Sequence, residues 1–195
     1  MRKSLLFTLG LLTLLSFNTE AETFKSIEAD VYFSPNGGAE EAVVDGINSA
    51  KKEVLVQAFL FSNKRITEAL IAACERKIDV KVIVDKEMKH HHHNTVPMLL
   101  KSSVPTFIDD KHRTAHNKVM ILDESTVITG SFNFTKSAET RNAENLLVIR
   151  SIAMAKAYKK NWDKHFRHSI AATKDLIVPS KKRKDDRARR TLRAH

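Results

Sequence analysis

Four polar residues around one predicted β-hairpin have the side chains that phosphoryl chemistry requires: His116, Lys118, Ser131 and Asn133. Cleavage of a phosphodiester needs a nucleophile, a cation near the non-bridging oxygens, and neutral donors that hold those oxygens in place. A neutral imidazole can attack phosphorus to give a phosphohistidine, which water then hydrolyses. Lysine supplies the cation, and the hydroxyl and amide supply neutral donors. The four residues therefore predict a phosphodiester-cleaving site.

The hairpin is predicted from two short runs of mostly β-branched residues, 119–122 and 126–129, with turn residues between them. We expect residues 124–125 to form a two-residue loop. Asp123 lies at the start of this turn, where an aspartate most often bonds nearby backbone, so direct contact with a substrate is the less expected role.

A two-residue loop fixes which residues face each other across the hairpin. It would place Lys118 opposite Ser131 and His116 opposite Asn133. Because side chains alternate along a strand, the four polar groups would then share one face. Gly130 lies beside them, and a glycine there would let the backbone approach a ligand closely.

The hairpin residues also match a family signature. The spacing HxKxxxxDxxxxxxGSxxN resembles the HKD motif of the phospholipase D superfamily, and it is formed by His116, Lys118, Asp123, Gly130, Ser131 and Asn133. Larger members carry two such motifs and this chain carries one, so it is most similar to the small single-motif branch of Nuc-type endonucleases and related phospholipase D-like proteins. In that branch two monomers pair so that both motif histidines face one phosphodiester. The resemblance therefore implies a homodimer with its active site at the two-fold interface.

The resemblance also suggests a role for Glu144, because a glutamate at this place in the family is positioned to hold the catalytic imidazole. A carboxylate on the second ring nitrogen would fix the tautomer and stabilise the imidazolium. Alternatively, Glu144 is a surface residue paired with Arg141. The predicted catalytic residues are thus the following: His116, Lys118, Asp123, Ser131, Asn133 and Glu144.

Other histidines could contribute to substrate binding. His112 and Arg113 precede the motif and could reach a flanking phosphate, although both could equally face solvent. The run His90 to His93 resembles a metal-binding tract, but consecutive histidines in an extended loop point to opposite sides and no carboxylate pattern completes a site. We expect the run to line the substrate groove, and we expect neither a metal nor a cofactor.

The two ends of the chain differ from its centre. Arg2 and Lys3, followed by an apolar run over 5–15, predict a signal peptide over residues 1–21, cleaved after Ala21, and hence an exported, periplasmic or secreted protein. An uncleaved anchor is the weaker alternative, because the run is shorter than the roughly 20 residues that span a bilayer. The tail over 179–195 is strongly basic, so we expect it to be disordered and either to hold nucleic acid or an anionic membrane surface or simply to aid solubility.

Between these ends, residues 22–178 are expected to form one catalytic domain in which strands and helices alternate. The resulting fold class is α/β, with a mixed, mainly parallel β-sheet flanked by helices on both faces, an α-β-α sandwich typical of phospholipase D-like proteins. Strands are expected at 29–33, 53–60, 80–84, 106–108 and 145–149, in addition to the hairpin, and helices at 39–51, 66–76, 96–101 and 152–168. The last helix is expected to bury Ala153, Ala157, Trp162 and Phe166.

Taken together, the sequence predicts an exported, metal-independent phosphodiesterase. A nonspecific endonuclease that cleaves DNA or RNA is the first hypothesis. A phospholipase D acting on phosphatidylcholine or cardiolipin is the second, because the same catalytic groups would serve any phosphodiester. A polyanion-binding module with an idle site is the third.

Overall fold

An eight-stranded β-sheet runs through the part of the chain that this computed structural model describes, residues 21–25 and 27–178. Its strand order is β1-β7-β6-β5-β2-β3-β4-β8. The strands are β1 (Glu28–Ser34), β2 (Glu53–Ala58), β3 (Asp79–Asp85), β4 (Thr106–Asp109), β5 (Lys118–Leu122), β6 (Thr126–Gly130), β7 (Glu144–Arg150) and β8 (Ile170–Ala171). The predicted signal peptide, apart from Ala21, and the predicted basic tail lie outside the described residues.

The sheet is mixed, as predicted. β1, β2, β3, β4 and β6 point in one direction, so five of the eight strands are mutually parallel in orientation. Hydrogen-bonded parallel neighbours occur only in β2–β3 and β3–β4. The other five neighbouring pairs are antiparallel, so the expectation of mainly parallel pairing is wrong. Four of these pairs arise because the chain inserts the β5–β6–β7 meander between β1 and β2, and the fifth is β4 with β8.

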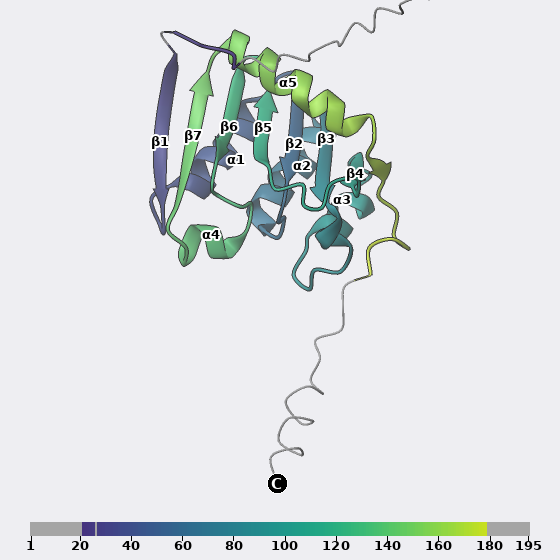
Figure 1. Ribbon diagram of the computed structural model, residues 1–195. Helices are drawn as coiled ribbons and strands as arrows, with labels where there is room; N and C mark the ends of the chain where they lie inside the picture. Colours follow the sequence, from purple (N-terminus) through teal and green to yellow (C-terminus); the bar gives the residue numbers. More distant parts are fainter. Residues whose placement is uncertain (1–20, 26, 179–195) are drawn as a thin grey trace, which may run out of the picture.

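Helices cover both faces of the sheet, which confirms the predicted α-β-α sandwich (Figure 1). The helices are α1 (Ala39–Ser49), α2 (Lys64–Glu75), α3 (Val96–Lys101), α4 (Lys136–Thr140) and α5 (Ile152–Phe166), with a 3₁₀ turn, η1, at Lys86–Lys89. Helix α5 lies on one face, and α1 and α2 lie on the other. The described helices include none with both the length and the apolar character needed to cross a membrane.

Alternation along the central strands divides the core into two parts. Val54 and Val56 pack into the larger cluster beneath α1 and α2, whereas Leu55 packs against α5. The apolar face of α5 differs from the prediction, since Ala153 is exposed and the buried stripe starts from Ala155. The stripe continues through Tyr158, Trp162 and Phe166, and Trp162 also donates a hydrogen bond to the Val56 carbonyl (3.0 Å).

The predicted hairpin forms, but its register differs from the expected one. Leu122 pairs with Thr126, so three residues rather than two connect the strands. Asp123 and Glu124 both adopt left-handed backbone conformations, with φ of 51° and 53°. The pairing shifts by one residue as a result, and the predicted opposition of Lys118 to Ser131 and of His116 to Asn133 is wrong. The last pair before the site is Val119 with Thr129.

Asp123 secures the opposite end of β5 from Lys118. Its carboxylate accepts hydrogen bonds from the backbone N–H groups of Lys51 (2.8 Å), Lys52 (2.8 Å) and Glu53 (3.0 Å), at the connection between α1 and β2. Partial burial would raise the pKa of the Asp123 carboxyl, but the three donors outweigh burial and lower the pKa. The five residues of β5 hold it roughly 17 Å from Lys118 along the strand.

We expect Asp123→Ala to lower the free energy of unfolding at pH 7 by about 1–2 kcal/mol, because three backbone donors lose a charged acceptor. Since the folded-state pKa is depressed, this stabilisation is present above the ordinary carboxyl pKa and is lost as the pH falls through the folded-state value. Urea titrations of wild type and variant at pH 7 and pH 3 would measure it. Glu124→Ala, a change at the exposed neighbouring position, is the matched control. A loss that is equally large at both pH values would contradict this role.

Candidate active site

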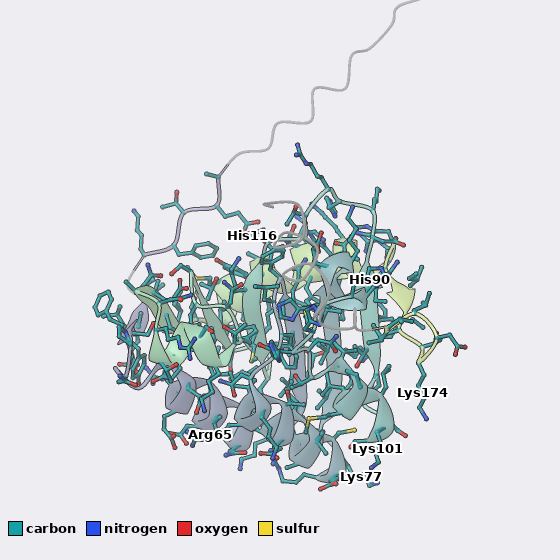
Figure 2. The ribbon with its side chains drawn as sticks, turned by 90° about the horizontal axis from the view of Figure 1, so that it is seen from below. Arg65, Lys77, His90, Lys101, His116 and Lys174 are labelled. Carbon is teal, nitrogen blue, oxygen red and sulfur yellow. The ribbon has the colours of Figure 1, made fainter. Side chains whose placement is uncertain are left out.

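The motif residues lie at the sheet edge where the parallel strands end. β5 runs antiparallel to β2, so its first residue, Lys118, pairs with Ala58 at the carboxyl end of β2. Asp85 and Asp109 end β3 and β4 at the same edge. Open α/β sheets bind ligands outside the carboxyl ends of their strands. Figure 2 views this end of the strands from below. His116 lies there, far from Lys77, which follows α2, and from Lys101, which ends α3.

Gly130 turns the chain out of the sheet at the end of β6. The N–H groups of Ser131 and Phe132 both donate to the Asn145 carbonyl oxygen, at 3.1 and 3.2 Å. A Cβ atom on residue 130 would lie 2.3 Å from that oxygen, and the φ of 153° also favours glycine. The Asn145 backbone therefore occupies the space beside Gly130 where a ligand was predicted to approach.

The segment after Gly130 then crosses the start of β5. Phe134 forms a parallel bridge with Phe61, which follows β2, and its carbonyl accepts the N–H groups of Ser62 and Asn63. Because β5 lies between β6 and β2 in the sheet, the segment must pass over the end of β5 that carries the motif lysine. Phe132 and Phe134 are fully buried, so the polar residues between and before them face away from the core.

His116 and Lys118 lie in direct contact. Lys118 Nζ donates to the His116 carbonyl oxygen (2.7 Å) and lies 2.9 and 3.1 Å from its two ring nitrogens. The Phe59 ring supports both side chains, with its centroid 4.4 Å from the imidazole and 5.0 Å from the ammonium. His116 is exposed whereas Lys118 is only 6% exposed. An accessible imidazole is therefore paired with a desolvated cation, and both contact Phe59, which the sequence pattern did not single out.

Burial has an electrostatic effect on Lys118. It lowers the pKa of the Lys118 ammonium, and the negative charge of Glu144 opposes this by raising it. Glu144 accepts a hydrogen bond from the Asn142 amide (2.9 Å) rather than from the His116 ring. In this structure, Glu144 thus acts on the lysine through its charge, and the predicted contact with the imidazole is not formed.

Ser131 and Asn133 take different positions in the crossing segment. The exposed Ser131 hydroxyl accepts the Asn145 N–H (3.1 Å), which fixes its place beside the bulge. The side-chain oxygen of Asn133 is buried without a hydrogen-bond partner among the described residues. Asn133 also lines a pocket of about 760 Å³, a volume typical of small-ligand sites, together with His91, His93 and Arg141. Two histidines of the run thus lie beside a groove that reaches Asn133, and occupation of that groove by a substrate stays a prediction.

The loop before His116 is held from three sides. The Asp85 carboxylate accepts the Ala115 N–H, Lys86 Nζ donates to the His112 carbonyl (2.9 Å), and the Asn117 carbonyl accepts the Phe59 N–H (2.9 Å). Asp85 is completely buried. These contacts fix the backbone on both sides of His116 before a substrate binds.

Of the two predicted substrate contacts outside the motif, His112 is placed elsewhere, and contact through Arg113 stays a prediction. The His112 ring turns away from the motif and bonds the buried Asp109 carboxylate, and Arg113 is exposed. His165 and His168 contact the same carboxylate. Sequence reasoning did not single out Asp109, His165 or His168, although the spacings Asp-x-x-His and His-x-x-His were a usable signal.

Comparison with known sequences places this site in a family. A family model described as "Cardiolipin synthase, PLD-like domain" matches residues 43–166. The chain is 38% identical over 130 residues to a phospholipase D from Rickettsia bellii, covering 67% of this chain and 65% of that protein. It is 27% identical over 135 residues to the mitochondrial cardiolipin hydrolase of Xenopus laevis, covering 69% of this chain and 64% of that protein. The chain thus matches just under two thirds of the length of these relatives.

Solved structures agree with this assignment. Nuc from Salmonella typhimurium, a phospholipase D family member, superposes with a TM-score of 0.72 at 34% identity, covering 75% of this chain and 99% of that one. NucT from Helicobacter pylori shares the fold, with a TM-score of 0.69 at 22% identity over 75% of this chain. Because the family model matches more than half of the chain and Nuc is covered almost completely, the chain belongs to the phospholipase D superfamily of phosphodiesterases.

Proposed function

We propose that the protein is a metal-independent phosphodiesterase that works by double displacement through His116. The observation that carries this proposal is the exposed His116 ring in contact with the buried Lys118 ammonium, beneath the segment that carries Ser131 and Asn133. A nucleophile, a cation and neutral donors are the groups that phosphodiester cleavage requires.

In the first step, an imidazole nitrogen of His116 forms a bond to phosphorus and the bond to the leaving oxygen breaks. Lys118 neutralises the non-bridging oxygens, while Ser131 and Asn133 donate to them. In the second step, water attacks the phosphohistidine and releases the free imidazole. Asp123 takes no part in either step, because it supports the far end of β5.

The leaving oxygen needs a proton, and one motif supplies a single imidazole. Lys118 is a poor acid, and His112 is turned toward Asp109. We therefore propose a homodimer in which His116 of the second copy protonates the leaving oxygen and then activates water. A two-fold axis through the exposed patch would bring the two imidazoles to opposite sides of one phosphorus.

Nucleic acid is the substrate that we favour. Eleven of the twelve residues that line the pocket beside Asn133 are polar, and Leu60 is the exception, which suits a sugar-phosphate backbone better than acyl chains. The likeness to Nuc over almost its full length is consistent with this choice. A phospholipase D is the second candidate, because the Rickettsia relative bears that name and a lipid headgroup could occupy the same polar pocket.

The ends of the chain lead to two further parts of the proposal. The apolar run after Arg2 and Lys3 supports export, with cleavage after Ala21. The tail from Lys181 to His195 has eight basic and two acidic residues, so it would attract nucleic acid or an anionic membrane surface by charge alone.

We expect His116→Ala to abolish hydrolysis of bis-p-nitrophenyl phosphate, of single-stranded DNA and of cardiolipin vesicles, because each reaction needs the same nucleophile. Initial rates on the three substrates, measured side by side, would also rank the substrate classes. Lys77→Ala, a remote surface change, is the control. Retained turnover in folded His116→Ala would exclude the assignment, and binding of DNA by an inactive wild type would favour the binding-module hypothesis.

The lowered pKa of Lys118 predicts the alkaline limit of activity. If the reaction needs the ammonium form, kcat/KM should fall at a pH below the ordinary lysine value of 10.5. Glu144→Gln removes a charge that raises the Lys118 pKa, so its alkaline limb should move to still lower pH. A pH–rate profile of both proteins tests this, with Glu139→Gln on α4 as the matched carboxylate control. An unchanged or upward-shifted limb in Glu144→Gln would contradict it.

Mixing wild type with His116→Ala tests the shared site. If both copies of His116 serve one phosphodiester, a refolded equal mixture should retain about one quarter of the wild-type activity, because only dimers of two intact chains are active. Independent sites would retain about one half. Subunit exchange is verified with a size tag on one of the chains, and full activity of a dilute monomer in sedimentation would exclude the dimer.

A further inference from the structure

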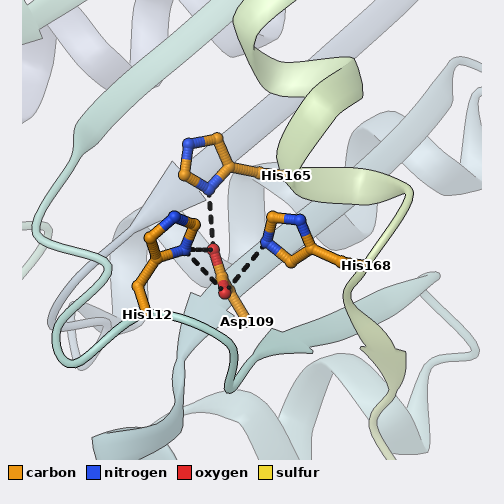
Figure 3. A group of neighbouring side chains, drawn as sticks. All are labelled: Asp109, His112, His165 and His168. Carbon is orange, nitrogen blue, oxygen red and sulfur yellow. Dashed lines mark hydrogen bonds and ion pairs between the residues drawn. The ribbon is translucent and has the colours of Figure 1, made fainter. Parts of the chain in front are cut away.

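A second cluster of chemically active side chains lies outside the motif. Three imidazoles turn one nitrogen each toward the carboxylate of Asp109 (Figure 3). His112 Nδ1 lies 3.0 Å from Oδ2, His165 Nδ1 lies 2.7 Å from the same oxygen, and His168 Nε2 lies 3.1 Å from Oδ1. One ligand atom from each of the four residues lies within 4.8 Å of every other.

Three separate elements bring this cluster together. Asp109 ends β4 and its side chain is fully buried, and His112 belongs to the loop that leads to the motif. His165 lies in the last turn of α5, and His168 follows two residues after its end. The imidazoles are mostly covered, with exposed side-chain fractions of 14% for His165 and 21% for His168. Residues remote in sequence therefore present their polar atoms to one point.

We propose that this cluster is a Zn²⁺ site, with three imidazole nitrogens and one carboxylate oxygen as ligands. Imidazole and carboxylate are common zinc ligands, and four of them complete a tetrahedron without an open position. Ligand atoms in such a tetrahedron are about 3.3 Å apart. The nitrogen-to-oxygen separations of 2.7–3.1 Å therefore need to open by a few tenths of an ångström, and the wider separations, which all lie within 4.8 Å, need to close. The site would be structural, because no coordination position remains for water or substrate.

Two details favour a metal over a simple ion pair. The single negative charge of one carboxylate balances only one imidazolium, whereas three rings converge on Asp109, with centroids only 4.8–5.4 Å apart. Moreover, His168 Nε2 is buried and makes no hydrogen bond among the described residues although it lies near Oδ1. This nitrogen points toward the other three ligand atoms but makes no hydrogen bond with them, so it is available to coordinate an ion at the centre of the cluster.

The charge of the cluster is also compatible with a cation. Burial would raise the pKa of the Asp109 carboxyl, but the three imidazoles outweigh burial and hold the pKa well below its usual range, so the group is anionic at neutral pH. A pocket of about 480 Å³ opens onto the histidines and gives an entry path. Lys111, Lys164 and Arg167 also line it, so the affinity should be lower than that of a cysteine-rich zinc site.

A metal here would stabilise the loop that carries the nucleophile. It would connect β4, α5 and the loop at His112, which is four residues before His116. Asp109 lies three strands from Lys118 in the order β5-β2-β3-β4, or roughly 14 Å at the usual strand spacing. The metal would therefore act on the stability of the domain rather than on phosphorus.

The test measures zinc binding and thermal unfolding of the chain purified without a polyhistidine tag. We expect about one Zn²⁺ per chain by calorimetric titration, and a rise in Tm of about 5–10 °C when free zinc exceeds Kd 100-fold. His168→Gln, at a partly exposed position, should lose both effects while keeping its circular dichroism spectrum. Asp109→Asn is the second variant and should give the same result if it folds.

Two controls separate this site from other histidines and from the catalytic proposal. His92→Ala/His93→Ala should keep the zinc effects, which excludes binding that depends on these two histidines of the run, and His116→Ala should keep them although it is inactive. Chelation with EDTA should lower Tm while hydrolysis at 25 °C continues. The inference is overturned if zinc leaves the wild-type Tm unchanged, or if His168→Gln binds zinc as wild type does.

Discussion

The site depends on the way the chain leaves β6. At Gly130 two consecutive N–H groups bond one carbonyl, that of Asn145, and this contact is close enough to exclude any side chain at residue 130. The bulge sends the next four residues across the end of β5 to pair with Phe61. Buried phenylalanines anchor this crossing on the core side, so the alternating serine and asparagine face away from the core. A backbone constraint thus decides where the two predicted phosphate donors lie.

A second constraint comes from the shared edge of the sheet. The ends of β3 and β4 carry the fully buried aspartates Asp85 and Asp109, and both are used to hold the loop that precedes His116. A buried carboxylate is costly unless it is fully bonded, so each of them fixes the groups that satisfy it. Asp123 does the same for the α1–β2 connection at the opposite end of β5. The carboxylates near the motif therefore organise the backbone, which is consistent with the proposed assignment of the phosphoryl chemistry to His116 and Lys118.

Sequence reasoning predicted the helices and strands more accurately than the register and the long-range contacts between them. Periodicity located α1, α2, α3, α5 and the strands from β1 to β7 within a few residues, because burial on one or both faces leaves a local pattern. The hairpin register was wrong by one residue, since two left-handed residues, Asp123 and Glu124, enlarge the turn without a glycine to indicate it. Phe59 and the cluster at Asp109 were missed because their contacts join residues far apart in sequence. No local sequence pattern indicates which strand end lies beside which helix end.

The separation of the two histidine groups also has a physical reason. His116 must stay accessible and keep a free nitrogen, which a resident metal ion would occupy. His112, only four residues earlier, bonds the buried Asp109 carboxylate and packs against His165 in the last turn of α5. The short loop between them is bonded by Lys86 and Asp85, so the two rings cannot exchange places without breaking buried contacts. Under the two proposals, the same loop would carry a ligand for a metal and a nucleophile for phosphorus, because its backbone keeps the two side chains apart.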